Sequence, residues 1–230
     1  MAGKNKLRKF AEITSLPNVL EAFTFDDGLL NINDLEKVRM KGQWGVSFFK
    51  NPHPIGLELA CGKGEYTLGL GRMYLDRNYI GMDVKGNRIW KGAREAIHTG
   101  LNNVGFLRSR IEFINHYFDE DEISEIWIIF PDPFLRLRDE KRRLTSKPFL
   151  DRYTRLLNDG AFLHLKTDSD ALFEFSQKTI HAHPHFSLIE VCEDVDRIGR
   201  SEEMAIRTYY EEMHLQEGKS IKYICARFNK

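Results

Sequence analysis

The stretch that most constrains the fold of this 230-residue chain is Ile55–Tyr66, with the sequence IGLELACGKGEY. Its first half is a short apolar run, which is typical of a buried central strand, and its second half is a glycine-rich turn that leads into a helix. Gly62 and Gly64 allow positive φ angles and let a ligand approach the backbone closely. The free amide groups of the following helix favour a polar or anionic ligand there. The stretch therefore predicts a nucleotide-type pocket.

Two cofactor chemistries use a pocket of this kind. A dinucleotide site has the pattern G-x-G-x-x-G, whereas the run from Gly62 is GKGEYT, with Thr67 in place of the third glycine. Glu58 lies on the strand itself, where a carboxylate suits the cationic amino-acid end of S-adenosylmethionine better than a pyrophosphate. Asp83 ends the next predicted strand, 21 residues after Gly62, a distance at which a carboxylate binds ribose hydroxyls. The pattern favours S-adenosylmethionine over NAD, and the plainer alternative makes Glu58 only a helix-end partner.

The composition excludes several classes of protein. Because 34 Lys and Arg residues balance 34 Asp and Glu residues, a nucleic-acid binder of this composition must concentrate its basic residues locally. Three widely spaced cysteines predict neither a disulfide framework nor a zinc site, which fits a cytoplasmic location. No signal peptide or membrane span is recognisable, so we expect no membrane partner. We also expect no metal, because no acid or cysteine completes a site with His181, His183 and His185. The sequence leaves open whether the chain forms a homodimer.

From residue 55 onward strand and helix patterns alternate, which predicts an α/β fold with a parallel sheet covered on both faces. We expect strands at 55–60, 79–83, 104–108, 124–130 and 160–166, and weaker ones at 186–192 and 221–228. We expect helices at 64–76, 86–99, 110–118, 146–158 and 169–182. Residues 1–54 are predicted to precede the main domain, 55–230, as a basic arm over 1–12 and a lead-in. The lead-in has a short helical piece at Asp34–Met40 and three aromatic anchors, Trp44, Phe48 and Phe49.

The loop after the predicted strand 124–130 is the second informative feature, and residues 130–146 read FPDPFLRLRDEKRRLTS. Its two prolines hold Asp132 in a stiff, extended backbone at a strand end, and Phe134 offers an aromatic face to a base. Segment 136–147 carries six Lys or Arg residues against two acids, and such residues contact phosphates. The plainer alternative is a solvated loop with local ion pairs. The pattern favours a nucleic-acid substrate that is presented to Asp132.

Two further segments are candidates for substrate contact. Asp168 follows the strand predicted at 160–166, although Thr167, Asp168 or Ser169 is about equally suited to cap the next helix. The run 207–211, RTYYE, is polar and aromatic, and its plainer interpretation is a helix surface.

With these pieces in place, the chain resembles the tRNA (guanine-N7-)-methyltransferase family of the bacterial TrmB type. The matching stretches are LELACGKGEYTLGLG (57–71), YIGMDVKGNRI (79–89), IFPDPFLRLRDEKRRLTSKPFLDRY (129–153), LHLKTDSDALFEFS (163–176) and TYYEEMHLQEGKSI (208–221). The resemblance implies a Rossmann-like class I S-adenosylmethionine-dependent methyltransferase with a seven-stranded, mostly parallel sheet. It implies methylation of N7 of the guanine at position 46, in the variable loop of tRNA. The alternative is a methyltransferase that acts on another RNA or on a small molecule.

The resemblance also implies a set of site residues. It makes Asp132 the catalytic acid. The expected cofactor residues are Glu58, Gly62, Gly64, Asp83, Arg110 and Ile111. The expected substrate residues are Arg136, Asp168, Thr208, Tyr209, Tyr210 and Glu211, and those expected on the tRNA backbone are Arg138, Lys141, Arg142 and Arg143. Three residues depart from the family pattern: Arg110 replaces the usual Asp, Phe134 a common Trp, and Arg136 a usual Lys.

Overall fold

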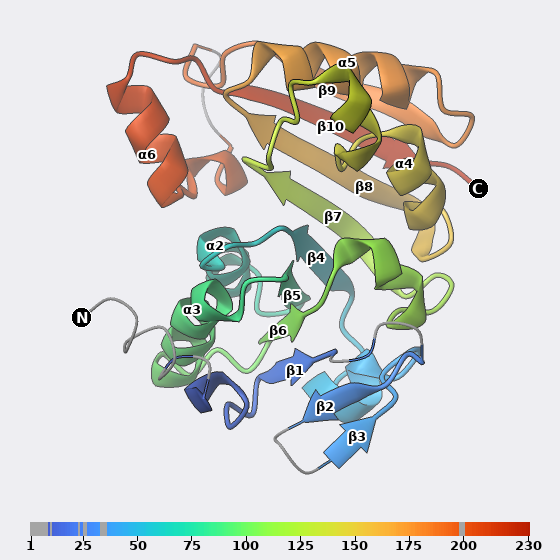
Figure 1. Ribbon diagram of the computed structural model, residues 1–230, viewed down its shortest axis with the longest axis vertical. Helices are drawn as coiled ribbons and strands as arrows, with labels where there is room; N and C mark the ends of the chain where they lie inside the picture. Colours follow the sequence, from blue (N-terminus) through green and yellow to red (C-terminus); the bar gives the residue numbers. More distant parts are fainter. Residues whose placement is uncertain (1–8, 10, 23, 25–26, 33–35, 198–200) are drawn as a thin grey trace.

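The computed structural model describes residues 9, 11–22, 24, 27–32, 36–197 and 201–230. Its centre is one sheet with the strand order β3-β2-β1-β6-β5-β4-β7-β8-β10-β9 (Figure 1). The strands are β1 (Val19–Glu21), β2 (Leu30–Ile32), β3 (Glu36–Val38), β4 (Ile55–Leu59), β5 (Asn78–Asp83), β6 (Val104–Arg108), β7 (Ile123–Ile129), β8 (Leu157–Thr167), β9 (Phe186–Cys192) and β10 (Lys222–Phe228). The α-helices are α2 (Glu65–Met73), α3 (Gly86–His98), α4 (Lys147–Tyr153), α5 (Asp170–His181) and α6 (Tyr209–Gln216).

The seven predicted strands are all present as β4 to β10. Parallel pairing joins six strands that are neighbours in the sheet, in the spatial order β1, β6, β5, β4, β7 and β8. In contrast, β10 pairs antiparallel with both β8 and β9. Parallel neighbours need crossover connections, and α2 and α3 supply them between β4, β5 and β6. The mostly parallel sheet that we expected is therefore confirmed.

Helices cover both faces of this sheet, as the apolar strand sequences predict. On one face Leu57 and Leu59 of β4 belong to a core that includes residues of α4 and α5. On the other face Trp127 of β7 packs with Tyr66 and Leu70 of α2. Figure 1 shows α2 and α3 together beside the β4–β6 half, and α4 and α5 beside the β8–β10 half. Because side chains alternate along a strand, β7 contributes residues to both cores.

The lead-in departs from our expectation of a segment that only precedes the main domain, because it extends the sheet to ten strands. Val19 of β1 pairs with Phe106 of β6, and β2 and β3 follow as an antiparallel pair. The helical piece predicted at Asp34–Met40 is wrong, since Glu36–Val38 forms β3; residues 33–35 lie outside the described residues. Strands of three residues are too short to show a two-residue period. The domain division at residue 54 stays a prediction, and most of the predicted arm 1–12 lies outside the described residues.

The aromatic anchors of the lead-in are confirmed. Trp44 and Phe49, in the π-helix η1 (Trp44–Phe49), are buried, and Phe48 packs against the same core. The indole Nε1 of Trp44 donates to the carbonyl oxygen of Tyr117 at 2.8 Å. These contacts fasten the lead-in to the sheet.

Two predicted helices are shorter than expected. The segment 110–118 forms only a 3₁₀ helix, η2 (Ile111–His116). Helix α4 ends at Tyr153 rather than at 158, because β8 already begins at Leu157, which pairs with Ile123 of β7. Within the described part of the chain, the helices are too short or too polar to cross a bilayer.

The strand order predicts where a ligand binds. From β4 the chain moves outward through β5 to β6, and it then returns to β7 on the opposite side of β4. In sheets of this kind ligands bind outside the carboxyl ends of the strands, at the point where the order reverses. The loops after β4 and β7 meet at this point, and they are the two loops that the sequence singled out.

Candidate active site

The glycine-rich turn after β4 has the backbone that its sequence predicts. Gly62 and Gly64 have φ values of +58° and +70°, which favour glycine. A Cβ atom on Gly64 would lie 2.5 Å from a ring carbon of Phe106, so this glycine is also needed for packing. A Cβ atom on Gly62 would meet nothing within 4 Å. The turn therefore presents open space at Gly62.

Two carboxylates, one on β4 and one on β5, accept hydrogen bonds from this turn and from the helix that follows it. Glu58 is buried, and its Oε2 atom accepts hydrogen bonds from the backbone N–H of Thr67, at 2.7 Å, and from the Thr67 hydroxyl. Asp83 accepts from Gly62 N at 2.9 Å and from Lys85 N at 2.7 Å. Burial raises the pKa of Glu58 to about 8, although the bonds from Thr67 lower it. Glu58 is thus a helix-end partner, as the plainer alternative held, and it also lines a cavity.

Three adjoining cavities share Ala60, the residue at the end of β4. One of about 60 Å³ is lined by Glu58, Gly62, Thr208 and Tyr210, among others. One of about 280 Å³ is lined by Asp83, Ser109, Arg110 and Ile111. One of about 170 Å³ is lined by Asp132, Phe134, Leu144 and Phe149. The fold therefore brings the predicted cofactor residues and Asp132 to one place.

The loop that carries Asp132 has an unusual backbone. Phe130 and Phe134 have φ values of +46° and +43°, a region that bulky residues rarely adopt. Such conformations persist only where the surroundings enforce them, and they cluster at functional sites. Asp132 is exposed, and its side chain has no hydrogen bond or ion pair with the residues that the structure describes. The acid is therefore available to a ligand.

Arg143 enforces this backbone, which corrects its expected contact with tRNA phosphates. It is only 4% exposed, and it donates from Nε to the carbonyl oxygen of Pro133 and from Nη2 to that of Phe134, each at 3.0 Å. Nη1 lies 3.3 Å from Glu140, and the guanidinium stacks 4.3 Å from the ring of Phe175. Because its donor groups are occupied by these contacts, Arg143 stabilises the loop that carries Asp132 and does not bind a phosphate. A run of three cations in the sequence does not reveal which one is buried.

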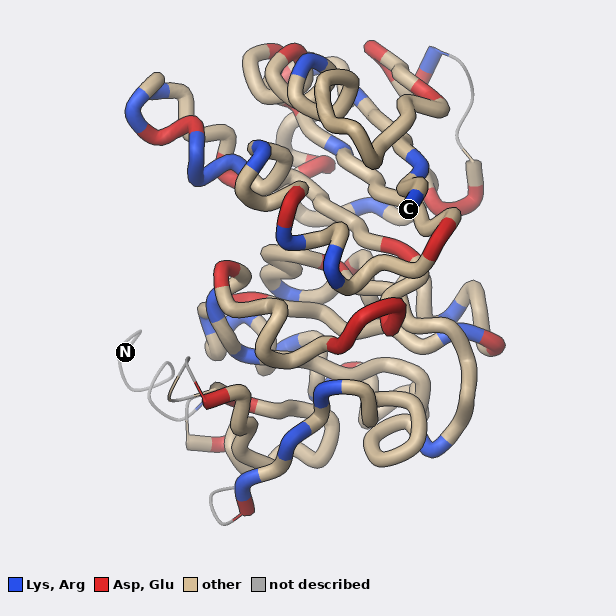
Figure 2. The backbone as a smooth tube through the Cα atoms, turned by 90° about the vertical axis from the view of Figure 1, so that its right-hand side faces the viewer, with Lys and Arg blue, Asp and Glu red and all other residues tan. Residues whose placement is uncertain are grey.

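The other four basic residues of this loop are exposed: Arg136, Arg138, Lys141 and Arg142. Part of their charge is offset, since Arg142 and Arg138 lie 3.6 and 3.9 Å from Asp139. The Arg142 guanidinium also lies 4.4 Å from the centre of the Phe134 ring. Figure 2 shows basic and acidic positions mixed over the height of the molecule, so any attraction for a polyanion is local.

The C-terminal run 208–211 forms the start of α6. The Thr208 hydroxyl accepts from Glu211 N at 3.2 Å and so caps the helix. Our expectation that Glu211 contacts substrate is wrong for its side chain, which is fully buried 2.7 Å from Lys166 Nζ. Lys166 also donates to the carbonyl oxygen of Met204 at 3.1 Å. The sequence analysis missed Lys166, although a lysine in a strand predicted to be buried is a signal of such a pair.

Two tyrosines join α6 to the glycine-rich turn. The backbone N–H of Tyr209 donates to Glu65 at 3.2 Å, and Lys63 Nζ lies 4.3 Å from the centre of the Tyr209 ring. Tyr210 is exposed and lines the cavity of Glu58. Segment 208–211 therefore covers one end of the candidate cofactor pocket.

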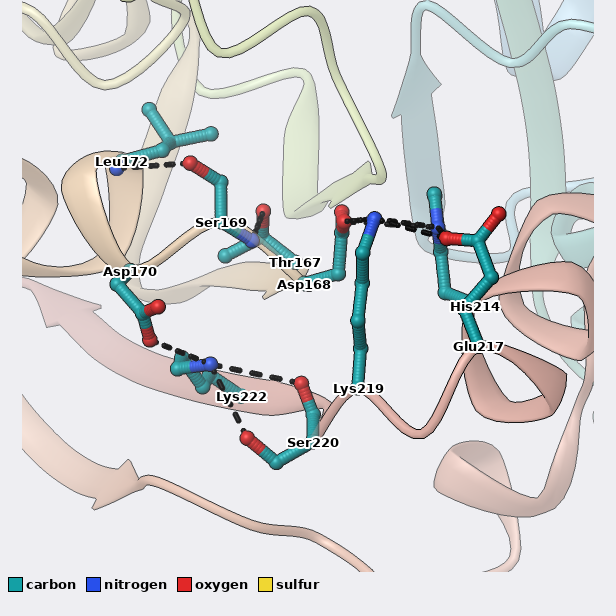
Figure 3. Close-up of polar contacts among 10 residues, drawn as sticks. All are labelled: Thr167, Asp168, Ser169, Asp170, Leu172, His214, Glu217, Lys219, Ser220 and Lys222. Carbon is teal, nitrogen blue, oxygen red and sulfur yellow. Dashed lines mark hydrogen bonds and ion pairs between the residues drawn. The ribbon is translucent and has the colours of Figure 1, made fainter.

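Asp168 lies at the carboxyl end of β8, as predicted, and Figure 3 shows its surroundings. Its carboxylate lies 3.1 Å from Lys219 Nζ and 3.5 Å from His214 Nδ1. The capping of α5 belongs instead to Ser169, whose hydroxyl accepts from Leu172 N at 3.3 Å. Asp168 thus ties the segment after α6 to β8, and substrate contact by it stays a prediction.

Arg110 and Ile111 lie beside Asp83 in the wall of the largest of the three cavities. The side chain of Arg110 is half exposed and forms an ion pair with Glu112 at 3.1 Å. Since it has no acceptor, any contact that it makes differs from that of the usual aspartate.

Comparisons with known proteins identify relatives that are methyltransferases. A family model described as "Putative methyltransferase" matches residues 52–224. A "tRNA (guanine-N(7)-)-methyltransferase" of Christiangramia forsetii is 42% identical over 226 residues, which cover 97% of this chain and 98% of that protein.

Two solved structures share the fold at low sequence identity. An antibiotic-related methyltransferase superposes with a TM-score of 0.61 at 18% identity, covering 84% of this chain and 96% of its own. A 16S rRNA (adenine(1408)-N(1))-methyltransferase variant from Catenulisporales acidiphilia, solved with the cosubstrate SAM, has a TM-score of 0.54 at 12% identity, covering 85% of this chain and 94% of its own. The expected Rossmann-like methyltransferase fold is therefore confirmed.

Proposed function

This chain belongs to the tRNA (guanine-N(7)-)-methyltransferase family, and on that premise we propose that it transfers a methyl group from S-adenosylmethionine to N7 of a guanine in tRNA. We propose position 46, in the variable loop, as the target, and the cytoplasm as the location. The observation that carries the proposal is the meeting of the three cavities at Ala60, so that the cavity of Asp132 adjoins those of Glu58 and Asp83.

The residues present fit the cofactor. Gly62 leaves open space between two carboxylates, and both carboxylates have polar surroundings at the switch point of the sheet. S-adenosylmethionine, when bound, supplies an activated methyl group. Glu58 is placed to receive a cationic amino group and Asp83 to receive ribose hydroxyls, while Ile111 offers an apolar surface to a base. Arg110 then lies at the rim of the same cavity.

The substrate chemistry explains why one acid is sufficient. N7 of guanine carries a lone pair and no proton, so no general base is needed to create the nucleophile. The remaining demands are placement of the base and stabilisation of the positive charge that it acquires. Asp132 meets both, because a carboxylate accepts hydrogen bonds from the Watson–Crick edge of guanine and attracts the developing charge.

We assign the exposed residues around the cavities to the tRNA. Arg136, Arg138, Lys141 and Arg142 are placed to contact phosphates, and Tyr209 and Tyr210 to contact the nucleotide at the opposite rim. Phosphate contacts position a nucleic acid without reading its sequence. The choice of guanine would then rest on Asp132 and the shape of the pocket.

The test is methyl transfer in vitro. Unmodified tRNA transcripts with guanine or adenine at position 46 are incubated with methyl-labelled cofactor, and the nucleosides are then separated. We expect 7-methylguanosine only in the guanine transcript. Label at another nucleoside, or transfer only to an rRNA fragment or a small molecule, would refute the proposal.

A further inference from the structure

A second group of basic residues begins at the N-cap of α3 and continues along this helix. Lys85, Arg88, Lys91 and Arg94 recur every third residue, and side chains three apart are neighbours on a helix. We call these four residues the α3 row. No Asp or Glu lies between residues 84 and 94. From its first to its last residue the row extends for about 14 Å along the helix.

The charges of the α3 row are largely uncompensated. Lys85 and Lys91 are exposed, and within the described residues no ion pair is found for Lys85, Arg88 or Lys91. Arg94 is the exception, with its Nε atom 3.5 Å from Glu12. In a chain with no net charge, three neighbouring cations without an ion pair are a local feature that attracts a polyanion.

The row begins at the candidate active site. Arg88 lines the cavity that also holds Glu58 and Gly62. Because α3 joins β5 to β6, it lies on one side of β4, whereas the basic loop 136–142 follows β7 on the other side. Arg88 of the α3 row and Arg142 of that loop therefore line adjoining cavities from opposite sides of β4.

An aromatic ring lies within the row. The ring of Trp90 has Lys9 Nζ 4.5 Å from its centre and the Arg94 guanidinium at 4.9 Å. Trp90 is partly buried and packs against the core beneath α3, whereas Trp44 and Trp127 are buried within the core. Cations that are interleaved with an aromatic face suit phosphates and bases together.

We propose that the α3 row is a second contact surface for the phosphate backbone of the RNA substrate, and this proposal rests on the proposed function. A nucleotide that enters the cavity of Asp132 lies between the α3 row and the loop 136–142. The nucleotides before and after it in the RNA chain then pass over both of these surfaces. The loop 136–142 supplies cations on one rim only, and the α3 row supplies them on the other. The partner is recognised by its phosphates, so the row adds affinity and orientation but no base specificity.

The test compares two double variants of the full chain. Lys85→Ala/Lys91→Ala removes two exposed cations of the row. Arg155→Ala/Lys178→Ala removes two exposed cations after α4 and on α5, as a control with the same charge change. Binding of a tRNA transcript is measured from about 50 to 200 mM salt, and binding of S-adenosylhomocysteine is measured alongside.

We expect the row variant to bind tRNA more weakly, with a slope of log affinity against log salt that is smaller by roughly 1.4 to 1.8. The control should keep the wild-type slope, and both variants should bind S-adenosylhomocysteine as the wild type does. In addition, tRNA should quench tryptophan emission in the wild type but not in Trp90→Phe. A wild-type slope in the row variant overturns the proposal. Because these readouts need no methyl transfer, failure of the proposed function is seen separately, as wild-type protein that does not methylate tRNA.

Discussion

The Nη2 atom of Arg143 donates a hydrogen bond to the backbone carbonyl oxygen of Phe134 at 3.0 Å. This contact stabilises the positive φ angle of Phe134, two residues after Asp132. We expect Arg143→Lys to reduce kcat between about ten- and a hundredfold, because one ammonium group does not reproduce the planar donor fork and a small displacement of Asp132 is costly. Steady-state kinetics on tRNA measure this effect, together with a thermal melt to show that the variant is folded.

Arg138→Ala, in the same loop, is the matched control for Arg143. Arg138 is exposed and is not among the residues that line the three cavities, so its loss should raise KM for tRNA and flatten the salt dependence of binding while kcat changes little. If Arg143→Lys behaved in this way and kept its kcat, its assignment as a positioning residue would be wrong.

Asp132→Asn tests the catalytic acid. The substitution keeps the shape of the side chain but removes its charge, so we expect kcat to fall by about a hundredfold or more. Asp132 is exposed and has no hydrogen bond within the described residues, so the free energy of unfolding should change by less than about 0.5 kcal/mol. Calorimetry should show wild-type binding of S-adenosylhomocysteine. Asp139→Asn, in the same loop, is the control that should keep its kcat.

The raised pKa of Glu58 predicts that cofactor binding depends on pH. Its pKa of about 8 means that the unliganded protein holds a proton there at pH 7, whereas an adjacent cationic amino group favours the ionised carboxylate. Binding should therefore lower this pKa and release up to about one proton. Affinity for S-adenosylhomocysteine should rise from pH 6 to pH 8 and then level off.

Calorimetry in two buffers of different ionisation enthalpy measures the number of protons released when S-adenosylhomocysteine binds. This number tests the predicted ionisation of Glu58. Glu58→Gln removes the titrating group, so its binding should be weaker and should lose the pH dependence. A wild-type affinity that is constant from pH 6 to pH 8 would show that Glu58 does not face the amino group.

Lys166 and Glu211 form an ion pair with both side chains fully buried. Lys166→Met leaves a buried carboxylate without the ammonium, and we expect a loss of about 3 to 5 kcal/mol in the free energy of unfolding. The double variant Lys166→Met/Glu211→Leu should recover most of this loss, because it removes both charges. Urea denaturation measures each value. Lys219→Ala, which breaks an exposed pair with Asp168, should cost less than about 1 kcal/mol.

The sequence by itself determined the sheet from β4 to β10 and the two loops at its switch point. These features depend on local patterns: apolar runs of strand length, Gly62 and Gly64 in a turn that needs positive φ, and two prolines that hold Asp132 at a strand end. Such patterns act over a few neighbours, so they are readable without the fold. The short lead-in strands were not predicted, because β1 is specified by its pairing with β6 and not by its own three residues.

Only the tertiary structure decided which of several similar residues faces a ligand. Arg142 and Arg143 are adjacent and chemically identical, yet one is exposed and the other bonds the backbone of the Asp132 loop. Likewise, Glu211 was expected at the substrate, but it is buried against Lys166, which lies 45 residues away in the chain. The burial of a charged side chain depends on distant partners that offset its desolvation, and these partners meet only when the chain has folded.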